Sequence, residues 1–264
     1  MYGFLVRPKW VGFHLLVVVG IVTMINLGFW QLRRLDERQA FNAAVEASYD
    51  QPPVGIDELV PGGAAPGDDV LDELEWRPVV VTGTYLPDET FFVVNRSQNG
   101  RAGRNVAVPL LLDDGRVVIV NRGFVPLATD PPPVPATDVE VIGRLRPTQE
   151  RGLGQLSDPA EGDLVEVQRI DIPRLAGQLP GPVVPMYVDL LRSDPAEGGG
   201  LPEPVAPPDL GEGDHLSYAV QWFIFATAVA VGWVLAVRRS VRTRRAASEA
   251  QERPAVETEQ PAPH

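Results

Sequence analysis

A histidine stands where the chain enters its second long apolar segment. His215 begins this segment, and Tyr218 and Trp222 follow it at helical spacing. One side of such a helix carries the following set: His215, Tyr218, Trp222, Phe225, Ala226, Val229 and Trp233. An imidazole above an aromatic groove suits a flat apolar macrocycle with a central iron, because histidine commonly holds haem iron. The alternative is that the tyrosine and tryptophans only mark a membrane interface, with His215 an ordinary histidine exposed to water.

Two arginines follow the first long apolar segment, and antiparallel packing of the two segments brings them to the membrane level of His215. Arg33 and Arg34 could pair with carboxylates on such a macrocycle, since guanidinium groups match carboxylates well. The alternative is that they contact lipid head groups or pair with Asp36 and Glu37.

The polar residues Gln31, Gln221 and His14 also lie in the apolar segments. Gln31 and Gln221 are expected to hydrogen-bond between the helices, with a typical gain of about 1 kcal/mol or less. His14 lies roughly 27 Å from the outer end of the first segment at the helical rise. It therefore cannot share a metal with His215, and we expect it to snorkel or to pack between helices.

The sequence argues against several other chemistries. It has no cysteine, which excludes disulfides, thiolate metal sites and covalent haem attachment. It contains no nucleophile elbow, Walker loop or HExxH zinc motif. Asp214, His215 and Ser217 are too close in sequence for a hydrolase triad, because such triads join distant segments. We therefore expect that the chain is not an enzyme.

The two apolar segments set the domain organisation, because each has about the 20 residues that cross a bilayer. The first is interpreted as an uncleaved anchor, since it is too long for a signal-peptide core. The expected fold class is a membrane protein of the α+β type, in which two transmembrane helices flank one β-rich extracytoplasmic domain. Its expected parts are a cytoplasmic N-terminus (1–9), transmembrane helix 1 (10–32), the extracytoplasmic domain (33–197), a Gly/Pro-rich linker (198–213), transmembrane helix 2 (214–237), and a basic, then disordered, cytoplasmic tail (238–264).

Charge indicates the orientation of the chain and one class of partner. Five arginines lie between Arg238 and Arg245, so the positive-inside rule places this end in the cytoplasm. Two spans return the N-terminus to the same side. Between Asp36 and Asp214 there are 31 carboxylates and 13 arginines, a net charge of −18. A nucleic-acid-binding domain carries the opposite sign, so no nucleic-acid partner is expected. The expected location of the chain is a bacterial-type plasma membrane.

The middle of the chain has short β-branched runs separated by turn residues. Gln51 to Asp72 is expected to be a loop, and Asp113-Asp114-Gly115 a hairpin turn. Asp171 is expected to cap a short helix from Ile172 to Gln178. The expected strands are Trp76 to Tyr85, Thr90 to Asn95, Val106 to Leu112, Arg116 to Arg122, Val139 to Leu145, Leu164 to Ile170 and Val184 to Leu190.

Several motifs in this order resemble the surfeit locus protein family of cytochrome c oxidase assembly factors. The most specific is His215-Leu216-Ser217-Tyr218-Ala219-Val220-Gln221-Trp222-Phe223. The others are Leu27 to Leu35, Arg77-Pro78-Val79 with Gly83-Thr84-Tyr85, Pro109-Leu110, Val120 to Pro126, and Gly143 to Arg146. The resemblance covers both apolar segments and most of the middle domain.

The resemblance implies a membrane factor that helps to insert haem a into the catalytic subunit of the terminal oxidase. It places the histidine proposed to bind haem a at His215. Tyr218 and Trp222 would flank the porphyrin, and Arg33 or Arg34 would face its propionates. The implied partners are the oxidase catalytic subunit, the enzymes of haem a biosynthesis and the lipid bilayer. The family often has two asparagines before the histidine, where this chain has Gly213 and Asp214.

Three further interpretations stay open at this point. Asp214 could orient the imidazole or repel a propionate. Arg122 could line a binding face, although a structural ion pair, with Gly123 in a turn conformation, is favoured. The main functional alternative is a scaffold that docks oxidase assembly intermediates without haem, and a membrane-anchored hydrolase ranks far below both.

Overall fold

The computed structural model describes residues 3–196 and 198–251, which form two compact units. One unit contains most of two long helices and the residues next to them. The other runs from Asn42 to Leu210 and contains a β-sheet. The α+β class with apolar helices at both ends is confirmed.

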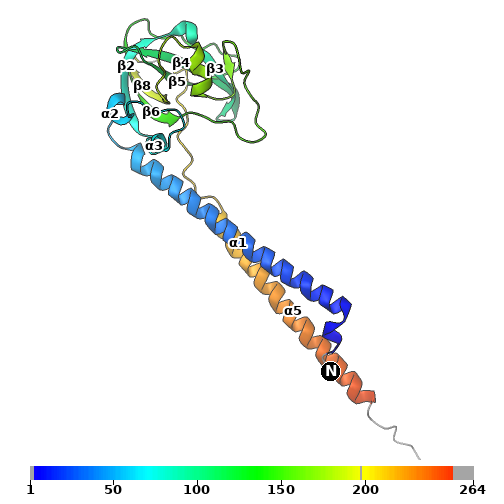
Figure 1. Cartoon of the computed structure of the whole chain (residues 1–264). Coiled ribbons are helices and arrows are strands. Elements are labelled where there is room, and N and C mark those ends of the chain that lie inside the picture. Colours follow the sequence, from blue (N-terminus) through cyan, green and yellow to red (C-terminus); the bar gives the residue numbers. More distant parts are fainter. Residues whose placement is uncertain (1–2, 197, 252–264) are drawn as a thin grey trace, which may run out of the picture. The chain divides into compact units, whose positions relative to one another are not determined.

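Two helices make up the first unit. After a short 3₁₀ helix (η1, Gly3–Val6), α1 runs from Pro8 to Tyr49 and α5 from His215 to Gln251 (Figure 1). Both are long and apolar enough to cross a membrane, and only 6% of each apolar window is buried. The α1 helix continues beyond the expected span, which ends at residue 32, by 17 residues to Tyr49. The α5 helix also includes the basic residues after Val237, whereas the predicted tail from 252 to 264 lies outside the described residues.

The less exposed positions of the two helices alternate in steps of three and four residues. On α1 they include Trp10, His14, Val17, Ile21, Met24, Gly28, Gln31, Leu35 and Arg38. On α5 they include His215, Ala219, Trp222, Ala226, Val229 and Trp233. This is the heptad spacing of helices that pack as in an antiparallel coiled coil. We call this line of contact the helix seam.

Five strands of the second unit close into a barrel. The sheet order is β1-β2-β6-β8-β5-β4-β3-β7, and an additional β2–β4 pairing closes the ring β2-β6-β8-β5-β4. The strands are β1 (Val54–Gly55), β2 (Pro78–Tyr85), β3 (Phe91–Gln98), β4 (Arg101–Leu112), β5 (Val117–Pro126), β6 (Val139–Pro147), β7 (Glu166–Val167) and β8 (Met186–Asp194). Strand β2 changes partner at Gly83, which pairs with both Val139 and Leu112. A Cβ atom at Gly83 would lie 2.2 Å from the Leu111 carbonyl oxygen, so closure requires glycine there.

The two faces of the barrel wall bury different apolar clusters. Alternate residues of all five ring strands, such as Val118 and Val120, form the interior core. The residues between them, such as Ile119 and Tyr187, face outward. There they pack with Phe91, Val93, Ala107, Leu164, Val167, Ile170, Ile172 and Leu175. The outer face of the barrel is therefore covered in part by the segment that follows β6.

Some predicted elements differ from the observed ones. The predicted loop from Gln51 to Asp72 contains β1 and two one-turn helices, α2 (Ile56–Leu59) and α3 (Asp69–Asp72). The predicted strand from Leu164 to Ile170 is reduced to the two residues of β7. These are corrections: Ile56 and Leu71 are buried in the core, so this part of the chain packs instead of forming an open loop.

Other local predictions are confirmed. The Asp113-Asp114-Gly115 turn joins β4 to β5, and Gly115 has a positive φ of 83°. The Asp171 side chain accepts a hydrogen bond from Arg174 N at 3.1 Å, at the start of α4 (Ile172–Leu175), which η3 (Ala176–Gln178) follows. The linker from 198 to 213 stays a prediction: its residues up to Leu210 belong to the β-sheet unit, and Glu203 forms an isolated bridge with Phe124. A further 3₁₀ turn, η2 (Pro87–Glu89), precedes β3.

Candidate functional site

His215 is half-buried at the start of α5, where its ring meets α1. Its Nδ1 atom lies 2.8 Å from Oε1 of Gln31. An amide oxygen can only accept a hydrogen bond, so Nδ1 carries the proton and Nε2 keeps its lone pair. Metal-binding histidines have this arrangement, with one ring nitrogen fixed by an acceptor and the other able to bind the metal.

Gly213, two residues before His215, lies close to the Nε2 edge of the ring and carries no side chain there. A Cβ atom at Gly213 would lie 3.6 Å from Nε2 and 3.5 Å from Cδ2 of the imidazole. Gly213 also has a φ of 68°, which glycine adopts without strain. Glycine at this position therefore fits a histidine whose Nε2 atom binds a ligand.

The predicted aromatic residues divide between the seam and its outer side. Trp222 is half-buried at the seam, whereas Tyr218 is 51% exposed and Phe225 is exposed. The Trp222 and Phe225 rings meet edge to face, with centroids 6.1 Å apart. Tyr218, Trp222 and Phe225 therefore form one stripe that begins one turn below His215 and faces outward beside the seam. We call these three side chains the aromatic stripe.

The seam itself is closely packed below His215. Ala219 is 1% exposed, and a Cβ atom at Gly28 would lie 2.7 Å from Cζ of Phe223. Phe223 also meets Phe29 edge to face at 5.5 Å. The predicted groove thus has no room for a flat ring system between the helices, and the aromatic stripe on the outside is an exposed aromatic surface near His215.

The two arginines at the end of the first span differ in their contacts. The Nη1 atom of Arg34 lies 2.7 Å from Oε2 of Glu37, and both side chains are exposed. Exposed pairs of this kind contribute about 0.2–1 kcal/mol, so another carboxylate can replace Glu37. Arg33 is exposed and makes no hydrogen bond or ion pair with the residues that the structure describes.

The other predicted partners of the imidazole make different contacts. Gln31 bonds to His215 rather than to Gln221, which corrects the predicted Gln31–Gln221 bond. The side chain of Asp214 is exposed and makes no hydrogen bond to the described residues, so Gln31 orients the ring. No residue other than His215 offers a metal-binding nitrogen at this end of the helix pair within the described residues.

His14 and Arg122 have structural roles here. Trp233 Nε1 donates a hydrogen bond to His14 Nδ1 at 2.8 Å, and the two rings are 5.6 Å apart. The predicted helix-packing role of His14 is therefore confirmed. Arg122 is buried and donates to the Pro132 carbonyl oxygen at 3.0 Å, while Gly123 has a φ of 129°.

Comparison with known proteins gives consistent similarities along the chain. Residues 18–227 match the model of the SURF1 family. A SURF1-like protein of Mycobacterium tuberculosis is 30% identical over 250 residues, which cover 92% of this chain and 89% of that protein. A SURF1-like protein of Monosiga brevicollis is 28% identical over 85% of this chain and 87% of its own. The cytochrome oxidase assembly protein SHY1 of Saccharomyces cerevisiae is 34% identical over 100 residues, 38% of this chain and 24% of that protein.

Proposed function

Because this chain belongs to the SURF1 family, we propose that it is a membrane-anchored factor for the assembly of haem-copper cytochrome c oxidase. The name of the yeast relative, a cytochrome oxidase assembly protein, supports this role. In this proposal the chain binds haem a and passes it to the catalytic subunit of the oxidase. It does not itself catalyse a reaction.

The observation that supports haem binding is the hydrogen bond between His215 and Gln31. It fixes the protonated nitrogen of the ring and leaves Nε2 able to bind iron. The donor set supplies one axial ligand and fits haem in that respect. The aromatic stripe offers an apolar surface on the same helix, beginning one turn from His215, and the lipid phase accommodates the isoprenoid tail of the cargo.

Arginines next to the site complete the proposed binding surface. Arg33 is free to pair with a propionate, and Arg34 can exchange its exposed partner Glu37 for one. Tyr218 and Trp222 would contact the porphyrin face. The proposed partners are the oxidase catalytic subunit, which receives haem a, and the enzymes that make it.

The proposed orientation follows from the charges near the spans. The arginines after Val237 favour the cytoplasm for that end of α5. Both termini then lie in the cytoplasm and the barrel outside it, in a bacterial-type plasma membrane. This orientation also places His215 at the extracytoplasmic surface of the plasma membrane.

The alternative is a haem-free scaffold that docks assembly intermediates through the barrel. The two proposals differ in a cell whose own copy is replaced by a variant. If the chain carries haem a, His215→Ala lowers the amount of assembled oxidase, whereas His14→Gln, the matched histidine control, leaves it near the wild-type level. Equal oxidase levels in His215→Ala and wild-type membranes, with equal amounts of protein, would exclude the haem role and favour the scaffold.

A further inference from the structure

The strand connectivity of the barrel indicates which of its faces binds ligands. In chain order the five ring strands are β2, β4, β5, β6 and β8. The first ring strand, β2, pairs with the second, β4, and with the fourth, β6. The third ring strand, β5, pairs in parallel with the fifth, β8. This is the connectivity of the OB-fold. OB-folds bind their ligands on the face formed by the second and third strands. The loop between strands one and two and the loop between strands four and five flank this face.

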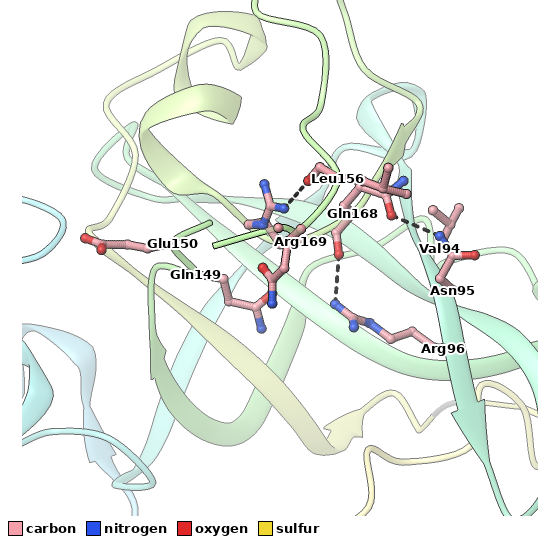
Figure 2. Close-up of a pocket in the computed structure, with 10 residues that line it drawn as sticks. Val94, Asn95, Arg96, Gln149, Glu150, Leu156, Gln168 and Arg169 are labelled. Carbon is pink, nitrogen blue, oxygen red and sulfur yellow. Dashed lines mark hydrogen bonds between the residues drawn. The ribbon is translucent and has the colours of Figure 1, made fainter. Parts of the chain in front are cut away.

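Two cavities lie at this face, one next to the other. The larger, about 700 Å³, is lined by β3 residues such as Arg96 and by residues 149–150, 154–156 and 168–169 of the fourth-to-fifth connection (Figure 2). The smaller, about 260 Å³, reaches Asn105 of β4 and Asn121 of β5. Arg96 and Gln149 line both cavities, so the two are adjoining parts of one depression.

The smaller cavity contains buried polar atoms that lack hydrogen-bond partners. Asn121 is 4% exposed, and its Nδ2 donates to Asp189 Oδ1 at 2.7 Å, but its Oδ1 accepts nothing. Nε1 of Trp76 and Nε of Arg146 are also buried without hydrogen-bond partners. Such groups are costly unless something pairs with them. Because Arg146 Nε lies 3.9 Å from Asp189 Oδ2 in an ion pair, the cavity presents one free acceptor, Asn121 Oδ1, and one free donor, Trp76 Nε1, to a bound molecule.

The charges around the depression indicate that the bound molecule is an anion. The lining contains two carboxylates, Glu150 and Asp189, besides its arginines. Nη2 of Arg146 lies 3.3 Å from Oε1 of Glu75, and Nη1 of Arg169 lies 3.8 Å from Oδ2 of Asp158. Arg96 has no such partner among the described residues, and one of its nitrogens donates to the Gln168 carbonyl oxygen at 3.0 Å. An unpaired guanidinium in a domain with a large excess of carboxylates is most simply explained by a ligand that carries a negative charge.

We propose that this depression binds a small hydroxylated carboxylate, such as a sugar acid. Its carboxylate pairs with Arg96, where the two cavities meet. A hydroxyl group both donates to Asn121 Oδ1 and accepts from a neighbouring N–H, which matches the mixture of free donors and acceptors. This site lies in the barrel and is independent of haem binding at His215, so the two proposals can fail separately.

Three six-carbon probes test the proposal on the purified full chain. Gluconate has both a carboxylate and hydroxyls, sorbitol has only the hydroxyls, and hexanoate has only the carboxylate. The readout is the indole N–H resonance of Trp76, assigned among the five tryptophans with Trp76→Phe. We expect gluconate to shift this resonance with saturation, and to bind at least about tenfold more tightly than either of the other probes.

The matched variants are Arg96→Gln and Arg192→Gln. We expect Arg96→Gln to weaken gluconate binding by at least about tenfold. Arg192 is exposed on β8 and lines neither cavity, so its variant should bind like the wild type. No saturable shift with gluconate up to roughly 10 mM, or equal binding by wild type and Arg96→Gln, would overturn the proposal and leave a water-filled depression.

Discussion

Two histidines occupy equivalent positions of the helix seam but differ in what their rings can do. At His215 the Nδ1 atom faces an acceptor, so Nε2 keeps a lone pair. At His14 the Nδ1 atom accepts from the Trp233 indole, so the proton is on Nε2. The hydrogen-bond partner rather than the position therefore separates a candidate ligand from a packing residue.

The first prediction concerns the residue that orients His215. Gln31→Leu removes the acceptor of Nδ1–H, and loss of such a partner typically weakens metal binding by about 10–100-fold. We expect a loss of this size in a haem a titration of the purified protein. Gln31→Glu keeps an acceptor and should retain binding. Unchanged affinity in Gln31→Leu would show that Gln31 does not orient a ligand.

The second prediction concerns the carboxylate buried on the outer face of the barrel. Burial raises the pKa of Asp189 above its ordinary value of 3.8, although Arg146 and Asn121 oppose the shift. The folded state then binds this proton more tightly than the unfolded chain. Stability is therefore lost as the pH rises from the ordinary pKa of Asp189 through the raised one. Glu75 lies in the same network, and burial raises its pKa as well.

Asp189→Asn removes one of these titrating groups and tests the sign. Circular dichroism gives the melting temperature of the barrel in the wild type and in the variant. As the pH rises from about 4 to about 7, we expect the wild-type melting temperature to fall relative to that of the variant. Because the substitution also changes the contact with Arg146, only the change of this difference with pH is informative. A difference that stays constant with pH would contradict the raised pKa.

At the level of single residues, the sequence marks His215 as a candidate ligand but does not indicate the residue that orients its ring. The place of His215 at the start of an apolar segment indicated a candidate ligand. Its hydrogen bond with Gln31 joins residues 184 positions apart and depends on the register of the two helices. The cluster of Asn121, Asp189 and Arg146 unites three strands, and no local pattern indicates it. The Asn99-Gly100 pair, with φ values of 51° and 74°, was a usable turn signal for the β3–β4 hairpin.

At the scale of elements, the helix pair depends on a close contact near its outer end. Gly28 is buried against the ring of Phe223, and this contact lies within one turn of Gln31. The packing of these two elements therefore determines whether Gln31 and His215 can meet. A larger side chain at position 28 would have to displace the ring.

The third prediction follows from this contact. We expect Gly28→Leu to destabilise the helix pair by about 1–3 kcal/mol through overpacking, measured as a lower melting temperature of the helical signal in detergent. Phe223→Ala in the same chain makes room for the leucine and should restore part of the loss. Gly232→Leu is the control, because a Cβ atom there meets nothing within 4 Å. Equal effects at positions 28 and 232 would contradict the close packing.

Most elements of the barrel were predictable, but its closure was not. Strands with alternating or continuous burial, such as β5 and β6, were found within a few residues of their ends. The closing β2–β4 pairing involves only three residue pairs and depends on the close approach at Gly83. The composition of the segment from Gln51 to Asp72 indicated a loop, but the segment is ordered because Ile56 and Leu71 are buried in the core.

At the scale of the whole molecule, the two proposals assign anchoring and haem binding to the helix unit and recognition of a small ligand to the barrel. The helix unit carries His215 and the apolar surface, and the barrel carries most of the negative charge and the depression around Arg96. In the proposed orientation, the barrel and His215 belong to the same, extracytoplasmic side of the membrane. The orientation of the chain is therefore part of the proposed function.

The fourth prediction tests this orientation. The chain has no cysteine, so single cysteines report their own exposure without a background signal. We expect a membrane-impermeant maleimide to label Asp88→Cys in intact cells and to label Thr243→Cys only after the membrane is opened. Asp88 and Thr243 are both exposed, which makes the two sites comparable. Labelling in the reverse order would place the barrel in the cytoplasm.

The most direct test of the proposed function is the visible spectrum of the full chain purified from cells that make haem a. We predict that the wild-type protein carries a haem a spectrum, that His14→Gln retains it, and that His215→Ala loses it at an equal protein yield. A wild-type protein without this spectrum, or a His215→Ala protein with the same spectrum, would contradict the assignment of His215 as the iron ligand.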